Sequence, residues 1–257
     1  MSIFSKLLPS RVRFYIREFH AIRDRALRSE AALMHAEAAI DVILGVPTDY
    51  QALAFNGQKR RQTIFADLLS ALDARLIVET GTYTGITTGY MASTSGLPVI
   101  SSEVNPRFYQ VARLRLKDFS GVRIENVDSR QLLRKLAADR VNTETPTFFY
   151  LDAHWYGDFP LREEIELIAE NWPEFMILID DFRVTGDDGY GFDDYGGGES
   201  LTVDYIRGVV SKYDLAVFFP AARSSEETGH RRGCVTLAPK VLACKLEGLK
   251  SVRRGSA

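Results

Sequence analysis

The sequence has few cysteines and no long apolar segment. Its 257 residues include only Cys234 and Cys244, too few for a disulfide scaffold or a four-cysteine zinc site, so we expect ordinary thiols in a reducing compartment. No stretch approaches the roughly 18 apolar residues that span a bilayer. Residues 1–19 also lack the apolar core and the small-residue cleavage site of a signal peptide. These absences predict a cytoplasmic protein without stable membrane insertion.

The sequence also lacks an excess of charge of either sign. It has 32 Lys and Arg residues against 34 Asp and Glu residues, which gives a formal net charge of −2. Nucleic-acid-binding proteins usually carry a basic surplus, so we expect no nucleic-acid partner. The charges are unevenly distributed along the chain, because residues 180–199 hold seven acids and one base, whereas residues 1–30 hold seven bases and three acids. A locally acidic face is therefore available for function.

Three segments of the chain differ in their patterning. Residues 1–55 have helical spacing and predict an N-terminal helical arm that packs on the core or joins a homo-oligomer. Residues 56–240 alternate apolar runs with amphipathic stretches and predict the main domain. Residues 241–257 form a basic C-terminal tail in this interpretation. Trp155 and Trp172 are expected in the core, although Trp155 follows His154 and can instead line an acceptor pocket.

The apolar runs of the main domain predict its fold. They lack period-two alternation, which is typical of parallel strands buried on both faces between helices. Two further runs near the end of the domain, joined by a polar loop, predict an antiparallel hairpin. The expected fold class is α/β: a Rossmann-like, doubly wound, seven-stranded sheet with a terminal antiparallel hairpin and an N-terminal helical extension. The runs are residues 75–79, 98–103, 122–127, 147–152 and 175–180, followed by LAVFFP and CVTLAP.

A glycine-containing turn follows the first run. Gly81 and Gly85 permit a tight turn and the close approach of a ligand to the backbone. The Lys of a phosphate-binding P-loop is missing after Gly85, and the dinucleotide pattern G-x-G-x-x-G is not met. A simple strand-to-helix turn is the alternative interpretation.

Acidic residues follow the second and third runs. Glu103 ends the second run, at a position where a carboxylate can accept both hydroxyls of a ribose. Asp128 and Ser129 follow the third run. There Asp128 can bond an adenine amino group, or it can cap the helix that begins near Arg130, and both roles can hold together.

Together these residues resemble the motifs of class I S-adenosylmethionine-dependent methyltransferases, over roughly residues 56–240. The resemblance implies that Glu79 and Gly81 lie along the methionine part of S-adenosylmethionine, Glu103 on the ribose and Asp128 near the adenine. In this interpretation Asn56, Gly57 and Gln58 help to close the site over the cofactor. The alternative is that these three residues only form the turn that enters the first core helix. The complete set of expected cofactor residues is Glu79, Gly81, Thr82, Tyr83, Gly85, Thr87, Glu103, Asp128, Ser129 and Gln58.

The fourth and fifth runs end in further polar residues. Asp152 and His154 fall on the same side of an extended chain, and Asp180 and Asp181 end a very apolar strand. Three carboxylates at adjacent strand ends can bind a hard divalent cation such as Mg²⁺, so we predict a metal site of Asp152, Asp180 and Asp181. Hydrogen bonding of these aspartates to backbone amides and loop hydroxyls is the alternative.

This second group resembles the metal-dependent O-methyltransferases of the macrocin type, which act on sugars of macrolide and coumarin antibiotics. In that family matching aspartates hold the metal, and a residue two positions after the first takes the hydroxyl proton. Here that position is His154 instead of an acid. A neutral imidazole can perform the same transfer, so His154 and Asp152 are the candidate catalytic residues, with a packing role for His154 as the alternative.

A Gly- and Asp-rich segment, residues 184–200, follows the second pair of aspartates. Long loops of this kind are usually functional or disordered. We interpret this one as a lid or acceptor-binding loop, with Tyr190, Phe192 and Tyr195 available to stack on a ligand ring.

The predicted function is therefore methyl transfer from S-adenosylmethionine to a hydroxyl of a sugar, another small molecule or a glycan, with a divalent metal as a possible aid. The alternatives are an N-methyltransferase on the same core and a Rossmann-like binding protein without turnover.

Overall fold

A computed structural model describes residues 25–30, 32–38, 42, 49–154 and 158–255. Most of the predicted N-terminal arm, and Trp155, lie outside the described residues. Residues 25–30 and 32–38 are helical, with Leu27 and Leu33 exposed. A role of this arm in oligomer formation stays a prediction. Across the described ranges, no helix has the length and apolar character needed to cross a membrane.

Within the described ranges, eight strands form one sheet in the order β3-β2-β1-β4-β5-β7-β6-β8. Strands β1 to β5 pair in parallel, and β7, β6 and β8 add antiparallel pairings at one side. The predicted Rossmann-like sheet and its terminal hairpin are thus confirmed, although the strand count is eight instead of seven. The strands are β1 (Leu76–Thr80), β2 (Val99–Ser102), β3 (Val122–Glu125), β4 (Thr147–Leu151), β5 (Phe175–Ile179), β6 (Leu215–Pro220), β7 (Val235–Pro239) and β8 (Val252–Arg254).

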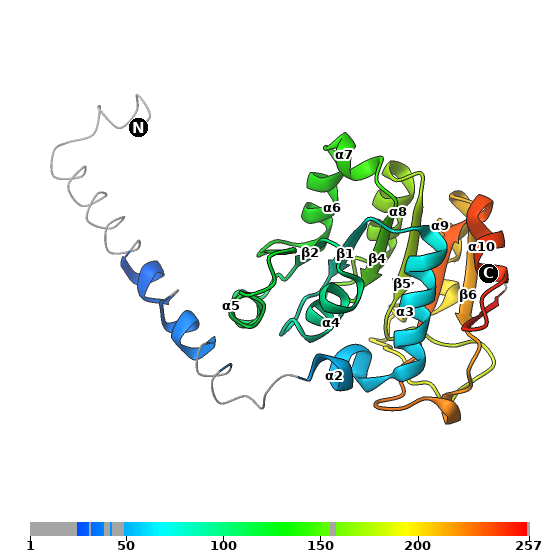
Figure 1. The fold of residues 1–257 in the computed structure, drawn as a ribbon, viewed down its shortest axis with the longest axis horizontal. Helices are drawn as coiled ribbons and strands as arrows, with labels where there is room; N and C mark the ends of the chain where they lie inside the picture. The colour runs from blue at the N-terminus through cyan, green and yellow to red at the C-terminus, as the bar shows by residue number, and fades with distance from the viewer. Residues whose placement is uncertain (1–24, 31, 39–41, 43–48, 155–157, 256–257) are drawn as a thin grey trace.

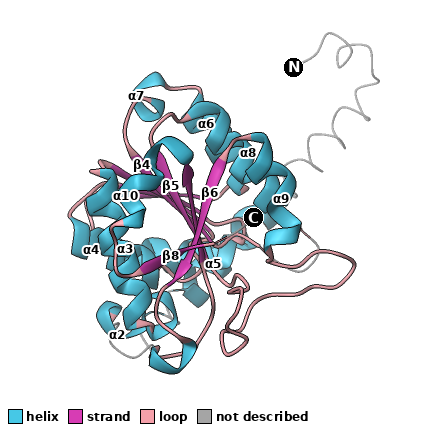
Figure 2. Cartoon of the chain, turned by 90° about the vertical axis from the view of Figure 1, so that its right-hand side faces the viewer, coloured by secondary structure: helices cyan, strands magenta, loops and turns pink. Residues whose placement is uncertain are grey.

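Helices cover both faces of this sheet, so its central strands carry apolar side chains on both sides. Figure 2 shows α3, α4 and α10 on one face and α8 and α9 on the other. Two apolar clusters result, one beneath α6, α8 and α9 and one beneath α2, α3, α4 and α10. Trp172 belongs to the first cluster and donates to the Asn142 carbonyl (3.0 Å), so its predicted core position is confirmed. The helices are α2 (Tyr50–Gly57), α3 (Lys59–Leu72), α4 (Ile86–Ser95), α5 (Pro106–Arg115), α6 (Ser129–Ala137), α7 (Arg140–Thr143), α8 (Leu161–Asn171), α9 (Val203–Lys212) and α10 (Ala243–Glu247), with 3₁₀ turns η2 (Ser224–Glu226) and η3 (Lys240–Leu242).

The segment after residue 240 continues the folded domain. It forms η3 and α10 and then β8, which pairs with β6 and supplies the eighth strand. Leu246 and Val252 are buried against the sheet, whereas Arg253 and Arg254 are exposed. Two of the basic residues that suggested a tail, Arg253 and Arg254, therefore lie on an edge strand.

The residues directly before the first core helix form an irregular helix. Helix α2 occupies residues 50–57, but Phe55 and Asn56 have φ angles of 53° and 60°, which break its regular path. The loop between β6 and β7 holds this break, because the His230 amide donates to the Asn56 carbonyl (2.9 Å) and the Thr228 hydroxyl donates to the Gly57 carbonyl (2.8 Å).

Removal of β8 tests whether the last residues belong to the domain. A chain that ends at Gly248 loses the burial of Val252, which is worth about 1.5–3 kcal/mol, together with the pairing on β6. We expect its free energy of unfolding, measured in urea, to fall by about 2 kcal/mol or more. Lys250→Ala, at an exposed position, is the control and should change it by less than about 0.5 kcal/mol. An unchanged unfolding midpoint for the shortened chain would show that β8 is dispensable.

Candidate active site

The candidate site lies at the carboxyl ends of the parallel strands, where ligands of open α/β sheets bind. Figure 1 places α2 and the loops that follow β5 and β6 at this edge of the sheet. The exits of β1, β2, β4 and β5 meet here because these strands run in parallel and in adjacent positions.

The loop after β1 is shaped by backbone conformations that favour glycine. Gly81 and Gly85 have φ angles of 84° and 80°, and Tyr83 between them has 49°. The Gly81 amide donates to the Ser102 carbonyl (3.0 Å), and a Cβ at position 81 would collide with the main chain at Asp152. The glycine loop therefore packs directly against the exit of β4.

Glu103, at the end of β2, faces this loop. Its carboxylate accepts from the Tyr83 amide (2.7 Å) and from the Asn105 amide (2.8 Å). Burial raises the pKa of Glu103, and these two hydrogen bonds oppose the rise. The Tyr83 side chain is exposed and its ring lies 4.4 Å from that of Phe108, centroid to centroid. Glu103 thus lies beside the glycine loop, and its contact with a ribose stays a prediction.

Glu79 lies at the base of the same loop in a fully buried position. Its Oε2 atom accepts from the Thr88 hydroxyl (2.5 Å) and the Ser101 hydroxyl (2.6 Å). Its Oε1 atom is buried without a partner, which is costly for a polar atom. Burial raises the pKa of Glu79 to about 7, although the two hydroxyls oppose the rise. The buried Oε1 atom leaves a place for one more hydrogen-bond donor.

Three other predicted cofactor residues have partners within the protein. The Thr82 hydroxyl contacts the Ser101 hydroxyl (2.5 Å), and the Thr87 hydroxyl accepts from the Phe55 amide (3.3 Å). Gln58 is buried and donates to the Arg232 carbonyl (2.8 Å), whereas its Oε1 atom has no partner. Thr82 and Thr87 thus connect the glycine loop to its neighbours, and Gln58 connects α2 and α3 to the loop between β6 and β7.

Asp128 adopts the capping role that was one of its two interpretations. It accepts from the Arg130 amide (2.9 Å) at the start of α6 and also binds the Arg130 guanidinium, which extends to Asp158. Hydrogen bonds from Arg130 lower the pKa of Asp128 against the effect of burial. Ser129 follows it as a buried residue. The adenine contact of Asp128 stays a prediction.

Asp180 differs from its predicted role. Its carboxylate forms a buried ion pair with Arg61 of α3 and accepts from the Tyr150 hydroxyl and from the Asp181 amide (2.6 Å). Asp180 and Arg61 are only 2% and 1% exposed, so this carboxylate is neutralised by Arg61 inside the protein. The predicted metal triad of Asp152, Asp180 and Asp181 is therefore not the group that the structure brings together.

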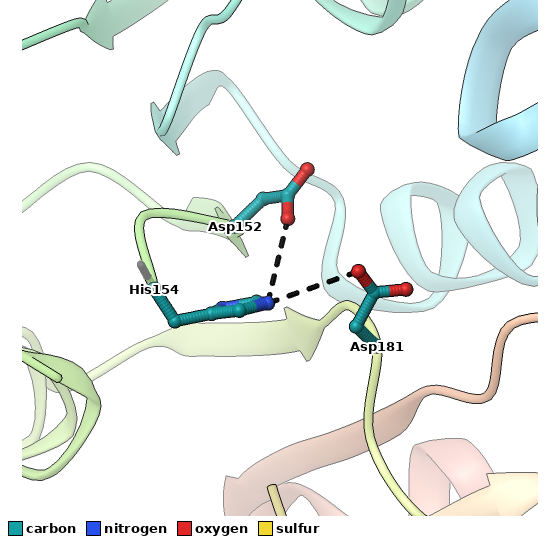
Figure 3. Close-up of side chains that lie close together, drawn as sticks. All are labelled: Asp152, His154 and Asp181. Carbon is teal, nitrogen blue, oxygen red and sulfur yellow. Dashed lines mark ion pairs between the residues drawn. The ribbon is translucent and has the colours of Figure 1, made fainter. Parts of the chain in front are cut away.

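Asp152, His154 and Asp181 form that group instead. Figure 3 shows the carboxylates of Asp152 and Asp181 directed at the His154 ring, and one ligand atom from each residue lies within 4.8 Å of the others. The His154 Nε2 atom lies 3.7 Å from Asp152 Oδ1 and 3.9 Å from Asp181 Oδ2. Asp181 has a φ angle of 51°, in the left-handed region that few residues other than glycine adopt.

Two further residues border this group and were missed by the sequence analysis. Asp193, from the loop after β5, has its Oδ2 atom 3.7 Å from His154 Nε2. Arg232, from the loop between β6 and β7, donates from Nε to Asp181 Oδ1 (2.6 Å) and from Nη2 to Asp193 Oδ1. Neither residue stands at a strand exit, so only the acidic surplus of residues 180–199 pointed to this region.

The close packing of these charges shifts their protonation. Burial raises the pKa of Asp152, and the nearby Asp181 adds to the rise, although His154 opposes it. Burial also favours the neutral form of Asp181, but its contacts with His154 and Arg232 lower its pKa to about 2. Burial lowers the pKa of His154, whereas Asp181, Asp152 and Asp193 more than reverse this effect and raise it above its ordinary value.

The three aromatic side chains of the 184–200 loop lie in different surroundings. Tyr190 was expected to be available for stacking on a ligand. It is instead buried in the core, where its hydroxyl donates to the Ala222 carbonyl (3.2 Å). Phe192 lies beneath the Arg183 guanidinium. Tyr195 stays near the site, because its hydroxyl donates to Asp193 (2.7 Å) and its ring packs edge-on against Phe159.

The donor atoms fit a divalent cation. The carboxylates of Asp152 and Asp181 converge beside the His154 imidazole, and carboxylate oxygens are the donors that hard divalent cations prefer. The cofactor residues also fit S-adenosylmethionine, since the glycine loop leaves its backbone approachable and Glu103 offers a carboxylate beside it.

Comparison with solved structures places the fold among methyltransferases. A Klebsiella pneumoniae protein provisionally assigned as an O-methyltransferase superposes with a TM-score of 0.52 at 16% identity, over 79% of this chain and 96% of that one. The Streptomyces achromogenes O-methyltransferase TomG, involved in tomaymycin synthesis and solved with S-adenosylmethionine, gives 0.52 at 17% identity, over 82% and 88%. Streptomyces venezuelae DesVI gives 0.50 at 15% identity, over 80% and 98%. No protein-family profile and no curated protein matches the sequence. At these identities the likeness establishes the fold.

The raised pKa of Glu79 makes stability depend on pH. Its pKa is about 7 in the folded protein and close to 4.5 in the unfolded chain, so between these values the folded protein binds more protons. The free energy of unfolding should therefore fall as the pH rises from 5 to 8, by up to about 3 kcal/mol from this residue. Urea unfolding of the wild type and of Glu79→Gln at both pH values isolates this contribution. If the two proteins lose equal stability over this range, the assignment to Glu79 is wrong.

The buried pair of Arg61 and Asp180 predicts strong energetic coupling. Arg61→Met leaves a buried carboxylate without its counter-ion and should lower the free energy of unfolding by about 3–5 kcal/mol. Asp180→Asn should be similarly costly. The double variant Arg61→Met/Asp180→Asn should lose less than the sum of the two, by about 1–3 kcal/mol in a urea-based double-mutant cycle. Additive losses would mean that the pair does not act as a unit.

Proposed function

We propose that this protein is an S-adenosylmethionine-dependent methyltransferase that acts on a hydroxyl of a small molecule or glycan, with the aid of a divalent metal. The observation that carries the proposal is the position of the glycine loop, which contacts Glu103 and packs against the exit of β4 at Asp152. Asp152 in turn lies in one group with His154 and Asp181. A cofactor-binding loop and a polar group capable of acid–base chemistry are thereby adjacent on one edge of the sheet.

The cofactor-binding residues divide into two sets. Glu103 offers its carboxylate to the ribose hydroxyls, and the exposed ring of Tyr83 lies next to it. Glu79 keeps a buried Oε1 atom free for a donor such as the ammonium of the methionine part. S-adenosylmethionine supplies an electrophilic methyl group when bound, so the work of the protein is to align the acceptor oxygen with it.

The group of Asp152, His154 and Asp181 serves the acceptor. Asp152 and Asp181 would hold the divalent cation, which supplies orientation of the acceptor and a lower hydroxyl pKa when bound. His154 is placed to take the hydroxyl proton at Nε2, and its neutral form is required for this step. The three acidic neighbours that raise the pKa of His154 also stabilise the imidazolium that results.

The loops above the strand exits would exclude water from the group of Asp152, His154 and Asp181. The 184–200 loop is tied down, since the Asp193 amide donates to the Asp181 carbonyl (2.9 Å) and the Leu201 amide donates to the Asp193 carbonyl (2.9 Å). Tyr195 and Phe159 supply apolar surface on the His154 side of the group. An acceptor bound there would meet an apolar wall and a row of carboxylates.

Binding of S-adenosylhomocysteine tests the proposal without knowledge of the acceptor. Isothermal titration calorimetry should detect binding to the wild type. Glu103→Gln keeps one acceptor oxygen for the Tyr83 amide but removes the charge, so it should bind about tenfold more weakly, the difference between a charged and a neutral hydrogen bond. Glu125→Gln, at the end of the neighbouring strand β3, where Lys135 pairs with the acid, is the matched control and should keep the wild-type affinity.

Two results would contradict the proposal. Absence of any heat or thermal shift with S-adenosylhomocysteine in the wild type would remove the methyltransferase assignment. Equal affinities of Glu103→Gln and Glu125→Gln would remove the role of Glu103 while leaving cofactor binding in place.

A further inference from the structure

We propose that Arg232 determines which divalent cation this site accepts, because it restricts Asp181 to a single metal-facing oxygen. The inference rests on the metal site of the proposed function and adds a specificity-determining residue from outside the set of metal ligands.

The contacts of Asp181 divide its two oxygen atoms between separate partners. Oδ1 accepts from Arg232 Nε at 2.6 Å, a short charge-assisted hydrogen bond. Oδ2 faces the His154 ring and belongs to the side on which Asp152 converges. With Oδ1 engaged by the guanidinium, Asp181 has one oxygen to offer to a cation.

Arg232 is held in this position by more than one link. Its Nη2 atom donates to Asp193, so the guanidinium bridges two carboxylates from two segments. Its carbonyl accepts from Gln58 Nε2 (2.8 Å) and from Arg61, and residues 191 and 232 form a β-bridge. The Arg232 side chain is 17% exposed, which is low for an arginine on a loop. The restriction on Asp181 is therefore a built feature of the fold.

A carboxylate limited to one oxygen discriminates between cations. Ca²⁺ takes six to eight oxygen ligands and often uses both oxygens of a carboxylate, whereas Mg²⁺ and Mn²⁺ are satisfied by octahedral sites with single carboxylate oxygens and water. Arg232 thus favours a small octahedral cation over Ca²⁺.

The test compares Mn²⁺ and Ca²⁺ binding to the full-length protein. Mn²⁺ affinity is measured by the loss of its free electron paramagnetic resonance signal, and Ca²⁺ affinity by competition with Mn²⁺. Arg232→Met removes the guanidinium but keeps an apolar stem, so Asp181 gains a second available oxygen. We expect the ratio of the Ca²⁺ to the Mn²⁺ dissociation constant to fall by about tenfold, the size of effect typical for residues that orient metal ligands.

A matched variant separates this role from simple loosening of the 184–200 loop. Asp193→Ala removes the second partner of Arg232 but leaves its bond to Asp181, so the ratio should stay within about twofold of the wild type. S-adenosylhomocysteine affinity reports whether each variant retains its fold. If Arg232→Met loses that affinity, Arg232→Leu, which also has no hydrogen-bond donor, replaces it with the same expectation.

Three results would overturn the inference, each in a different way. An unchanged ratio in a folded Arg232 variant that still binds Mn²⁺ would show that Arg232 does not set the selectivity. An equal shift in Asp193→Ala would assign the effect to the loop. A wild-type protein that binds S-adenosylhomocysteine but not Mn²⁺ would remove the metal site, and this inference with it, while leaving the methyltransferase proposal intact.

Discussion

The guanidinium of Arg61 and the carboxylate of Asp180 form an ion pair beneath the strand exits, almost completely removed from solvent. Each charge would be costly alone in this position, so the pair holds α3, β5 and the loop between β6 and β7 in one arrangement. Asp180 is buried against Arg61, and the next residue, Asp181, has a left-handed backbone conformation and faces His154 instead. The group of Asp152, His154 and Asp181 thus lies next to a buried ion pair that fixes the end of β5.

A second arginine, Arg232, compensates further carboxylates near this pair. Arg61 also binds the carbonyls of Arg232 and Gly233, and the Arg232 side chain in turn neutralises part of the charge of Asp181 and Asp193. Among the acids of residues 180–199, Asp180 is neutralised by Arg61 in the interior, whereas Asp181 and Asp193 share the Arg232 guanidinium beside the strand exits. The carboxylate oxygens available for a cation are therefore those that Arg61 and Arg232 do not bind.

Much of the fold was predictable from the sequence, because buried parallel strands such as 147–151 and 175–179 must be apolar on both faces. The eighth strand was not, since an edge strand as short as 252–254 carries too few apolar residues to signal itself. The placement of Glu103 beside the glycine loop followed from strand order alone. The role of Asp180 did not, because adjacent aspartates look equivalent in sequence, and their separation depends on Arg61, which is 119 residues away along the chain. Asp193 and Arg232 reach the site through loops, where spacing carries no such information.

We propose that the cofactor loop and the group of Asp152, His154 and Asp181 form a single site for methyl transfer assisted by a divalent metal. A crystal structure with S-adenosylhomocysteine and Mn²⁺, recorded at the manganese absorption edge, tests this claim most directly. We expect the cofactor product along the glycine loop with its ribose on Glu103, and an anomalous peak bounded by Asp152, His154 and Asp181, with Asp180 still paired to Arg61. A product bound elsewhere, or a manganese peak coordinated by Asp180 after separation from Arg61, would contradict it.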